Sequence, residues 1–275
     1  MRDGLRAGGG QGVERRMTGE RRGVLVAAFA SAVLAAVFVL AGPGSLAPSI
    51  VAAAWLVLVP VAALLQRVPP LDEIRAHRSG FYAASIAFLA AAGLVTLAVA
   101  AELREPSGLL RTWPSPLDAL LVPAIVLTAG GLGVVYAFRA LSVRFGWRET
   151  GVVQAIMPAT GREKGVFALL ALAAGVFEEV VFRGFLPVFL MPWTGSYLAG
   201  ALPVALVFGF LHAYQGRHGI ARTAVMGGIL AVGVAWTGSL WPSIFAHAAL
   251  DLILGLVLAK SLLGEPPAGP AMEGV

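Results

Sequence analysis

The stretch VFALLALAAGVFEEVVFRGFLPVF, from Val166 to Phe189, determines how the rest of the chain is interpreted. It is long and apolar enough to cross a bilayer as a helix, because about 20 apolar residues span the hydrocarbon core. Yet its interior carries Glu178, Glu179 and Arg183. A charged group at bilayer depth costs roughly 3 kcal/mol or more, so ionisable residues inside a span are functional candidates. The stretch therefore predicts a polar site within a membrane.

The composition also indicates a membrane protein. Hydrophobic residues make up 58% of the chain, charged residues 13%, and the mean hydropathy is +0.84. The net charge of +5 comes without any basic cluster interleaved with aromatic residues. This pattern suits an anionic lipid surface and argues against nucleic acid. There is no cysteine, which excludes disulfides, thiolate metal sites and a cysteine nucleophile. We therefore predict an all-α polytopic protein embedded in a lipid bilayer.

Eight apolar stretches are long enough to be transmembrane helices. The first lacks an A-x-A cleavage site, so we expect a retained helix and not a cleaved signal peptide. We expect the first four to form a scaffold and the last four to enclose the catalytic bundle. The predicted helices are Gly23–Ala41, Pro48–Leu65, Gly80–Ala101, Leu117–Phe138, Gly165–Phe189, Ser196–Tyr214, Ile220–Trp236 and Trp241–Ala259.

The basic residues predict the orientation of these helices. With eight spans, only Arg104 and Arg111 fall on the side opposite the amino terminus, and Arg183 lies inside a span. All other Lys and Arg residues fall on the amino-terminal side. By the positive-inside rule, both termini are expected in the cytoplasm. The high Ala, Gly and Arg content suggests a GC-rich bacterial genome, so we expect the bacterial inner (plasma) membrane.

Helical geometry separates the two adjacent carboxylates. Neighbouring helical residues point about 100° apart, so Glu178 and Glu179 do not share a face. Glu179 and Arg183 have the i, i+4 spacing of an ion pair, which lowers the cost of burying both. Glu178 is left without a partner in its own helix. A carboxylate of this kind suits a general base or acid, and Glu178 is our candidate for the chemistry.

Two later helices supply candidate partners with the same spacing. Phe208 and His212 lie four residues apart in one, and His247 and Asp251 lie four apart in another. Asp251 could accept a hydrogen bond from His247 and fix its tautomer. A carboxylate and a histidine that converge on one water form a base for hydrolysis, and the second histidine could stabilise an oxyanion. Taken singly, such residues could also serve structural roles, and Phe208 could simply pack against a neighbouring helix.

Together the three pairs resemble a known family. The segments E-E-V-V-F-R (178–183), F-G-F-L-H (208–212) and H-A-A-L-D (247–251) match the ordered motifs EExxxR, FxxxH and HxxxN/D. These are similar to the motifs of the CAAX prenyl protease and bacteriocin-processing family, also called the Abi or CPBP family of membrane proteases. The resemblance covers roughly residues 165–259. Each motif alone is weak, but all three in order on separate apolar helices are specific.

The resemblance implies a glutamate-type intramembrane endopeptidase that uses no metal. It implies that Glu178 and His212 activate water, that His247 and Asp251 form the oxyanion side, and that Glu179 and Arg183 support the site. The prenyl proteases carry Asn where this chain has Asp251, and an ionised Asp cannot donate a hydrogen bond. Asp251 is therefore either protonated, or its role is to orient His247.

The predicted partner is a peptide or a membrane-associated protein, cleaved near a terminus or in a loop. We rank a zinc site below the metal-free mechanism, and a transporter, a proton relay or a catalytically degenerate scaffold below a protease. The predicted organisation is a disordered cytoplasmic tail (1–22), a transmembrane scaffold (23–142), a cytoplasmic connection (143–164), a CAAX protease-like membrane domain (165–260) and a disordered tail (261–275).

The predicted depths of Glu178 and His212 in the membrane differ. At about 1.5 Å per residue, Glu178 lies roughly 20 Å from the cytoplasmic start of its helix, whereas His212 lies near the cytoplasmic end of its own helix. The two can meet only if the first helix starts outside the bilayer, if it is tilted, or if a cavity dips inward from the cytoplasmic side.

Overall fold

The computed structural model describes residues 46–65, 68–101, 108, 112–146 and 150–263. The chain forms two compact units, residues 1–65 and 66–275. No strand occurs in the described parts of either unit. Six helical segments in these parts are long and apolar enough to cross a membrane. The protein is therefore an all-α polytopic membrane protein, as the composition predicts.

The described part of the first unit is one helical span, Leu46–Leu65, predicted as Pro48–Leu65. It consists of α2 (Leu46–Ala53), a π-helical turn η1 (Ala54–Leu58) and α3 (Val59–Leu65). The predicted helix Gly23–Ala41 lies outside the described residues, so the count of eight stays a prediction.

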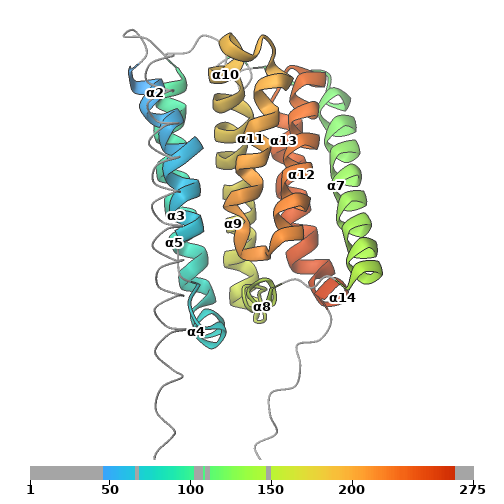
Figure 1. Ribbon diagram of the computed structural model, residues 1–275. Helices are drawn as coiled ribbons and strands as arrows, with labels where there is room; N and C mark the ends of the chain where they lie inside the picture. The colour runs from blue at the N-terminus through green and yellow to red at the C-terminus, as the bar shows by residue number, and fades with distance from the viewer. Residues whose placement is uncertain (1–45, 66–67, 102–107, 109–111, 147–149, 264–275) are drawn as a thin grey trace, which may run out of the picture. The chain divides into compact units, whose positions relative to one another are not determined.

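The second unit is a bundle of helices that run up and down along a common direction (Figure 1). The predicted helices from Gly80 onward correspond to α5, α7, α9 with α10, α11, α12 and α13. Its elements are α4 (Leu71–Ala76), α5 (Arg78–Ala100), α7 (Asp118–Phe145), α8 (Gly151–Ala155), α9 (Gly161–Glu179), η2 (Val180–Phe185), α10 (Leu186–Thr194), α11 (Tyr197–Leu211), η3 (Ala213–Gln215), α12 (Arg217–Thr237), α13 (Trp241–Leu252), η4 (Ile253–Leu258) and α14 (Ala259–Leu263).

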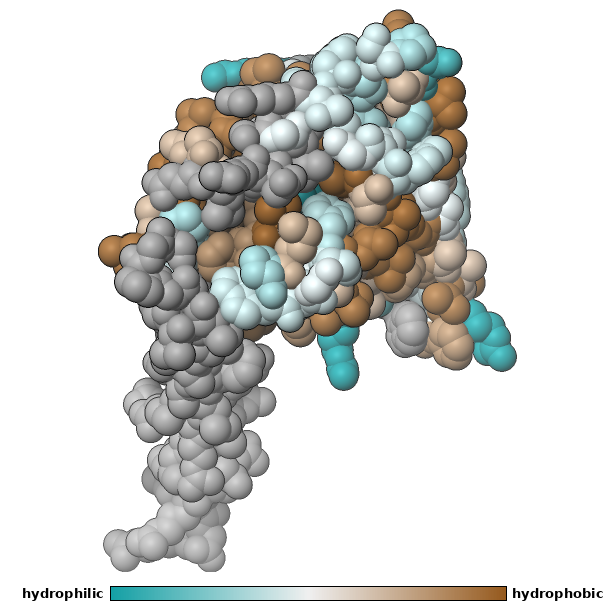
Figure 2. Space-filling view, turned by 90° about the horizontal axis from the view of Figure 1, so that it is seen from above, coloured by the Kyte–Doolittle hydropathy of each residue, from teal (hydrophilic) through white to brown (hydrophobic). Residues whose placement is uncertain are grey.

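Apolar residues cover the outer faces of these helices, as a lipid environment requires. On α11, Leu198, Leu202, Leu206 and Phe210 recur every four residues and are 48%, 68%, 53% and 46% exposed. A space-filling view from above shows strongly hydrophobic side chains at the flanks and paler, weakly polar ones on the end face (Figure 2). An exposed apolar stripe along a helix is typical of a surface that faces acyl chains.

The helix that carries the two carboxylates is longer than the sequence predicts. Thr160 caps its amino end: the Thr160 hydroxyl accepts from the Glu163 amide, and the Glu163 carboxylate accepts from the Thr160 amide. This reciprocal cap starts α9 at Gly161, one turn before the predicted Gly165. The helix then continues through the π-helical turn η2 into α10 and ends at Thr194. Both acidic residues therefore lie in the middle of a continuous 34-residue span.

The hairpin of α11 and α12 is shorter than its neighbours, and this changes the predicted depth of His212. α11 ends at Leu211 after 15 residues, where the sequence predicts a helix to Tyr214. In Figure 1 the turn that follows lies above α14 and above the start of α9, and the residue before α8, Thr150, donates to the Tyr214 carbonyl in this turn. At about 1.5 Å per residue, Glu178 lies about 26 Å along α9 from Gly161. Side-chain contacts link His212 to the carboxylates: the Phe208 ring lies between the His212 and His247 rings, and His247 Nε2 is 3.8 Å from Glu178 Oε2.

A close contact between α9 and α13 brings the acidic residues next to the second histidine motif. A Cβ atom added to Gly175 would lie 2.8 Å from the Ala248 Cβ and 3.0 Å from the Ala248 amide nitrogen. Only glycine allows two helical backbones to approach this closely. Gly175 lies one turn before Glu179, and Ala248 follows His247, so the contact sets the distance between the two motifs.

Candidate active site

Three helical segments of the second unit, α9 with η2, α11 with its C-cap, and α13, bring the predicted site residues into one cluster. α9 and η2 carry the EExxxR motif, α11 carries the FxxxH motif, and α13 carries the HxxxD motif. Direct contacts link the residues of all three motifs, as described below. The predicted catalytic residues are Glu178, His212, His247 and Asp251, and the predicted supporting residues are Glu179, Arg183 and Phe208.

Glu179 and Arg183 form the ion pair that their spacing predicts. Arg183 Nη1 donates to Glu179 Oε1 at 2.8 Å. Both residues are buried, with exposed fractions of 0% and 1%. The Arg183 guanidinium also lies over the Phe208 ring, 4.4 Å from its centroid, and its Nε donates to the Gly227 carbonyl at 3.4 Å. The pair is therefore enclosed on several sides, which makes loss of either charge costly for the fold.

Glu179 has a second partner that the sequence did not reveal. His247 Nδ1 lies 2.8 Å from the same Glu179 Oε1 atom. Since a carboxylate accepts, Nδ1 donates this hydrogen bond. Asp251 was expected to accept from His247, but its Oδ2 lies 3.7 Å from Nε2, the other ring nitrogen. Glu179, and not Asp251, therefore holds the orientation of the imidazole, because the direct hydrogen bond is to Glu179.

Glu178 and Asp251 face the opposite edge of the same ring. Glu178 Oε2 lies 3.8 Å from His247 Nε2, close to the 3.7 Å that separates Asp251 from it. Both distances exceed a direct hydrogen bond, so the two carboxylates lie beside Nε2 without bonding to it directly. The Glu178 side chain is 16% exposed and that of Glu179 is 0% exposed. The two neighbouring carboxylates thus occupy different surroundings, as the helical geometry predicts.

His212 caps the carboxyl end of α11 with its ring fixed by the backbone. Its Nδ1 lies 2.9 Å from the Phe208 carbonyl oxygen. That oxygen can only accept, so Nδ1 carries a hydrogen and the neutral ring presents Nε2 as an acceptor. A ring with a free Nε2 acceptor has the form that a general base or a water-orienting group needs. No direct contact between Glu178 and His212 was found among the described residues, and their joint action on one water stays a prediction.

Phe208 connects the parts of the cluster and does more than pack between helices. Its ring lies 4.8 Å from the His212 ring and 6.2 Å from the His247 ring, measured between centroids. It also stacks on Arg183, and it is only 4% exposed. One aromatic side chain therefore contacts the cation and both histidines, which supports its predicted position in the site.

Three further residues at the site were missed by the sequence analysis. The Tyr197 hydroxyl donates to the Arg183 carbonyl at 2.9 Å, and the Gly227 carbonyl accepts from the Arg183 side chain. Tyr214 lies two residues beyond His212, with the ring centroids 5.9 Å apart. A tyrosine at the start of an apolar helix needs a partner for its hydroxyl, and this signal was available for Tyr197. The contact of Gly227 depends on how α12 packs against η2, which no local signal indicates, whereas the contact of Tyr214 with His212 follows from the turn η3.

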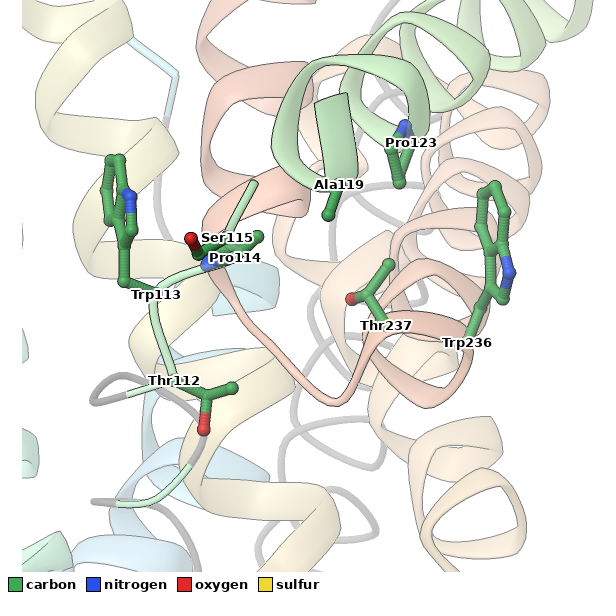
Figure 3. A pocket seen from close by; sticks show the side chains of 8 residues that line it. All are labelled: Thr112, Trp113, Pro114, Ser115, Ala119, Pro123, Trp236 and Thr237. Atoms are coloured by element: carbon green, nitrogen blue, oxygen red, sulfur yellow. The ribbon is translucent and has the colours of Figure 1, made fainter. Parts of the chain in front are cut away.

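The described residues contain no group of three or more His, Asp and Glu side chains arranged to hold a metal ion. A pocket of about 390 Å³ lies away from the cluster, at the end of the bundle where α12 ends and α7 begins. Figure 3 shows its walls, with the Trp113 and Trp236 rings on either side. It contains no ionisable residue, so it is not a second candidate for acid–base chemistry.

The short helix α8 packs near the recessed turn. The Thr150 hydroxyl donates to the Tyr214 carbonyl, and Gln154 Nε2 donates to the Leu263 carbonyl at 3.0 Å. Arg78 Nε donates to the Ala155 carbonyl at 2.7 Å, and the Tyr82 hydroxyl donates to the next carbonyl along the chain. α8 is therefore attached to α5, to α14 and to η3, directly beside the residues that follow His212.

A comparison with protein families agrees with this geometry. Residues 162–253 match the model of the type II CAAX prenyl endopeptidase Rce1-like family. The matched segment runs from the first turn of α9 to the end of α13 and includes all seven predicted site residues. This confirms the family resemblance inferred from the three motifs. No curated protein and no solved structure matches the chain. The family is one of proteases, which supports a peptidase embedded in a membrane.

Proposed function

We propose that residues 162–253 form the active site of an intramembrane endopeptidase that hydrolyses a peptide bond with water activated by Glu178 and His212. The observation that carries this proposal is the arrangement around His247. Glu179 holds Nδ1 at 2.8 Å, while Glu178 and Asp251 face Nε2 at 3.8 and 3.7 Å. An imidazole held at one nitrogen, with two carboxylates beside the other nitrogen, brings a donor and a general base together at one place, as a hydrolytic transition state requires.

In this mechanism Glu178 is the general base. As the water oxygen attacks the carbonyl carbon of the peptide, its proton passes to the Glu178 carboxylate. The same proton then goes to the peptide nitrogen as the carbon–nitrogen bond breaks. His212 accepts a hydrogen bond from the water through Nε2 and so orients it. A positioned general base of this kind contributes about 10²- to 10⁴-fold to the rate.

His247 and its neighbours form the side of the site that receives negative charge. When both ring nitrogens carry a proton, Nδ1 donates to Glu179 and Nε2 is free to donate to the oxyanion. Asp251 lies beside Nε2 as a counter-charge. Arg183 and Phe208 hold Glu179 in place from the other side. Preorganised donors aimed at the developing oxyanion are a large source of rate enhancement in acyl transfer.

The proposed substrate is a peptide or a membrane-associated protein. The turn after α11 lies inward of the bundle end where α9 begins. A chain terminus or an unfolded loop is therefore a better substrate for the cluster than a folded surface. The Ala-, Gly- and Arg-rich composition points to a bacterial source, where prenylated proteins are not expected. Prenylation is therefore not part of the proposal.

The proposal can be tested with the full-length protein in liposomes. Glu178→Gln and His212→Gln are each expected to abolish cleavage, while exposed Glu73→Gln and His77→Gln serve as matched controls that keep it. Comparing peptide termini in membranes with wild-type protein and with Glu178→Gln identifies the substrate. Full activity of either site variant would contradict the mechanism. Proton flux that depends on Glu178, without cleavage of any peptide, would favour a transporter.

A further inference from the structure

The proposed oxyanion side has few hydrogen-bond donors. Asp251 and Glu179 are carboxylates, and Arg183 is bound to Glu179 and to the Gly227 carbonyl. His212 uses its Nδ1 on the Phe208 carbonyl. Arg183 Nη2 has no hydrogen-bond partner among the described residues, but it is fully buried and so is closed to a substrate. His247 Nε2 is the other motif nitrogen that can donate. Amide or hydroxyl donors usually share this task in enzymes that cleave acyl groups.

Tyr214 lies at the edge of this cluster and carries a hydroxyl. It belongs to η3, directly after His212, and its ring lies 5.9 Å from the His212 ring at an interplanar angle of 38°. The residue is 37% exposed, so a bound peptide can reach its hydroxyl. A phenol has an ordinary pKa near 10, so it keeps its proton at neutral pH and can donate a hydrogen bond.

A hydrogen-bonded chain fixes the orientation of this hydroxyl. Arg222 Nη2 donates to Gln215 Oε1 at 2.8 Å, and Gln215 Nε2 donates to the Tyr214 hydroxyl oxygen at 3.2 Å. Arginine has no acceptor, so it requires the oxygen of the amide and leaves the amide nitrogen for the tyrosine. The Tyr214 oxygen accepts, and its own hydrogen remains available to donate to a substrate.

The backbone around Tyr214 is shaped to hold this chain together. Gly216 has φ +90° and ψ 177°, a conformation essentially confined to glycine, and it turns the chain from η3 into α12. Gly219 packs against the Gln215 side chain, so a Cβ atom there would displace the amide. The Tyr214 carbonyl accepts from the Thr150 hydroxyl. The turn is thus tied to both α8 and α12, which limits movement of the tyrosine.

We propose that the Tyr214 hydroxyl donates a hydrogen bond to the carbonyl oxygen of the scissile peptide bond. This rests on the proposed peptidase function. The bond strengthens as the carbonyl oxygen becomes the oxyanion, and the phenol keeps its proton throughout. The proton of the attacking water still passes to Glu178 and then to the leaving nitrogen. Tyr214 thereby supplies the neutral donor that an ionised Asp251 cannot.

The test is a pair of conservative substitutions measured on fluorogenic peptides that the wild-type protein cleaves in liposomes. Tyr214→Phe keeps the ring and removes the hydroxyl, so kcat is expected to fall about 100-fold with KM little changed. Tyr136→Phe makes the same chemical change on the exposed face of α7 and is expected to keep the wild-type kcat. An unchanged kcat for Tyr214→Phe would overturn the inference.

A second measurement separates donation from packing. Asp251→Asn introduces an amide donor, so in that background Tyr214→Phe is expected to reduce kcat less than 10-fold. Equal losses in both backgrounds would show that Tyr214 acts only through the structure and would overturn the inference. Cleavage by wild type with no effect of Tyr214→Phe contradicts this inference alone. Absence of cleavage by wild type across all peptides contradicts the proposed function and the inference with it.

Discussion

Oε1 of Glu179 accepts hydrogen bonds from two residues of different helices, Arg183 Nη1 and His247 Nδ1, each at 2.8 Å. Glu179 therefore stands between a buried cation and the imidazole of the proposed oxyanion side. Its neighbour Glu178 faces the other ring nitrogen at 3.8 Å. The two adjacent carboxylates thus have separate tasks, one in holding the site together and one in the proposed chemistry.

Glu179→Gln is expected to lower stability as well as activity. Removing its charge leaves Arg183 buried without a counter-ion, and breaking such a pair costs about 3–5 kcal/mol. Glu178→Gln, on the partly exposed neighbour, is expected to keep the melting temperature of wild type while losing cleavage. Thermal unfolding in detergent measures both. Equal melting temperatures for the two variants would contradict the division of tasks.

Gly175→Val is expected to destabilise the protein by separating α9 from α13. Even the Cβ atom would lie 2.8 Å from the Ala248 Cβ, and overpacking of this kind costs about 1–3 kcal/mol. Gly165, on the same helix, has open space at its Cβ position. Gly165→Ala is the control and is expected to be neutral or slightly stabilising. Comparing melting temperatures, with cleavage measured below them, checks the prediction.

Phe208→Leu is expected to reduce cleavage more than Phe210→Leu. The first change removes the ring that contacts Arg183, His212 and His247, including a cation–π contact of about 1–2 kcal/mol. Phe210 is 46% exposed on the outer face of the same helix. Measuring kcat and KM for both in liposomes tests this prediction. A similar loss in both variants would indicate a general effect on α11 and no special role for Phe208.

Arg78→Gln is expected to weaken the attachment of α8 to α5. This change removes the hydrogen bond to the Ala155 carbonyl at 2.7 Å and the ion pair with Glu163 at 3.5 Å. Faster amide hydrogen exchange in residues 151–156 is the expected result, because their tertiary attachments hold them closed. Arg75→Gln, an exposed neighbour on α4, is the control. Exchange rates unchanged from wild type would show that the other attachments of α8 suffice.

Chelating agents are expected to leave cleavage intact. In the proposed mechanism Glu178 and His212 activate the water, so neither 1,10-phenanthroline nor EDTA removes an essential group. Cleavage rates are compared before and after dialysis against the chelator. Loss of activity that added zinc restores would favour the zinc site that ranked second in the sequence analysis.

Much of the fold follows from local sequence. Runs of about 20 apolar residues predict spans, and six of the seven predicted from Pro48 onward are long and apolar enough to cross a membrane. The helix predicted as Ser196–Tyr214 is present only as the shorter Tyr197–Leu211. The predicted helix ends are less accurate. α9 starts at Gly161 and not at Gly165, and α11 ends at Leu211 and not at Tyr214. The cap formed by Thr160 with Glu163 extends the first of these, and this local signal was overlooked. The early end of α11 depends on a turn that the hydropathy does not mark.

The sequence by itself determined the membrane class, the three motifs and the pairing of Glu179 with Arg183. Each depends on residues within one helix, where a separation of four places side chains on one face. Only the tertiary structure decided that Glu179 holds His247, that Asp251 faces the other ring nitrogen, and that the site is recessed. These depend on residues as far as 68 positions apart, and on how closely Gly175 lets α9 approach α13. No local pattern sets the distance between two helices, because it depends on the side chains that both place at their contact.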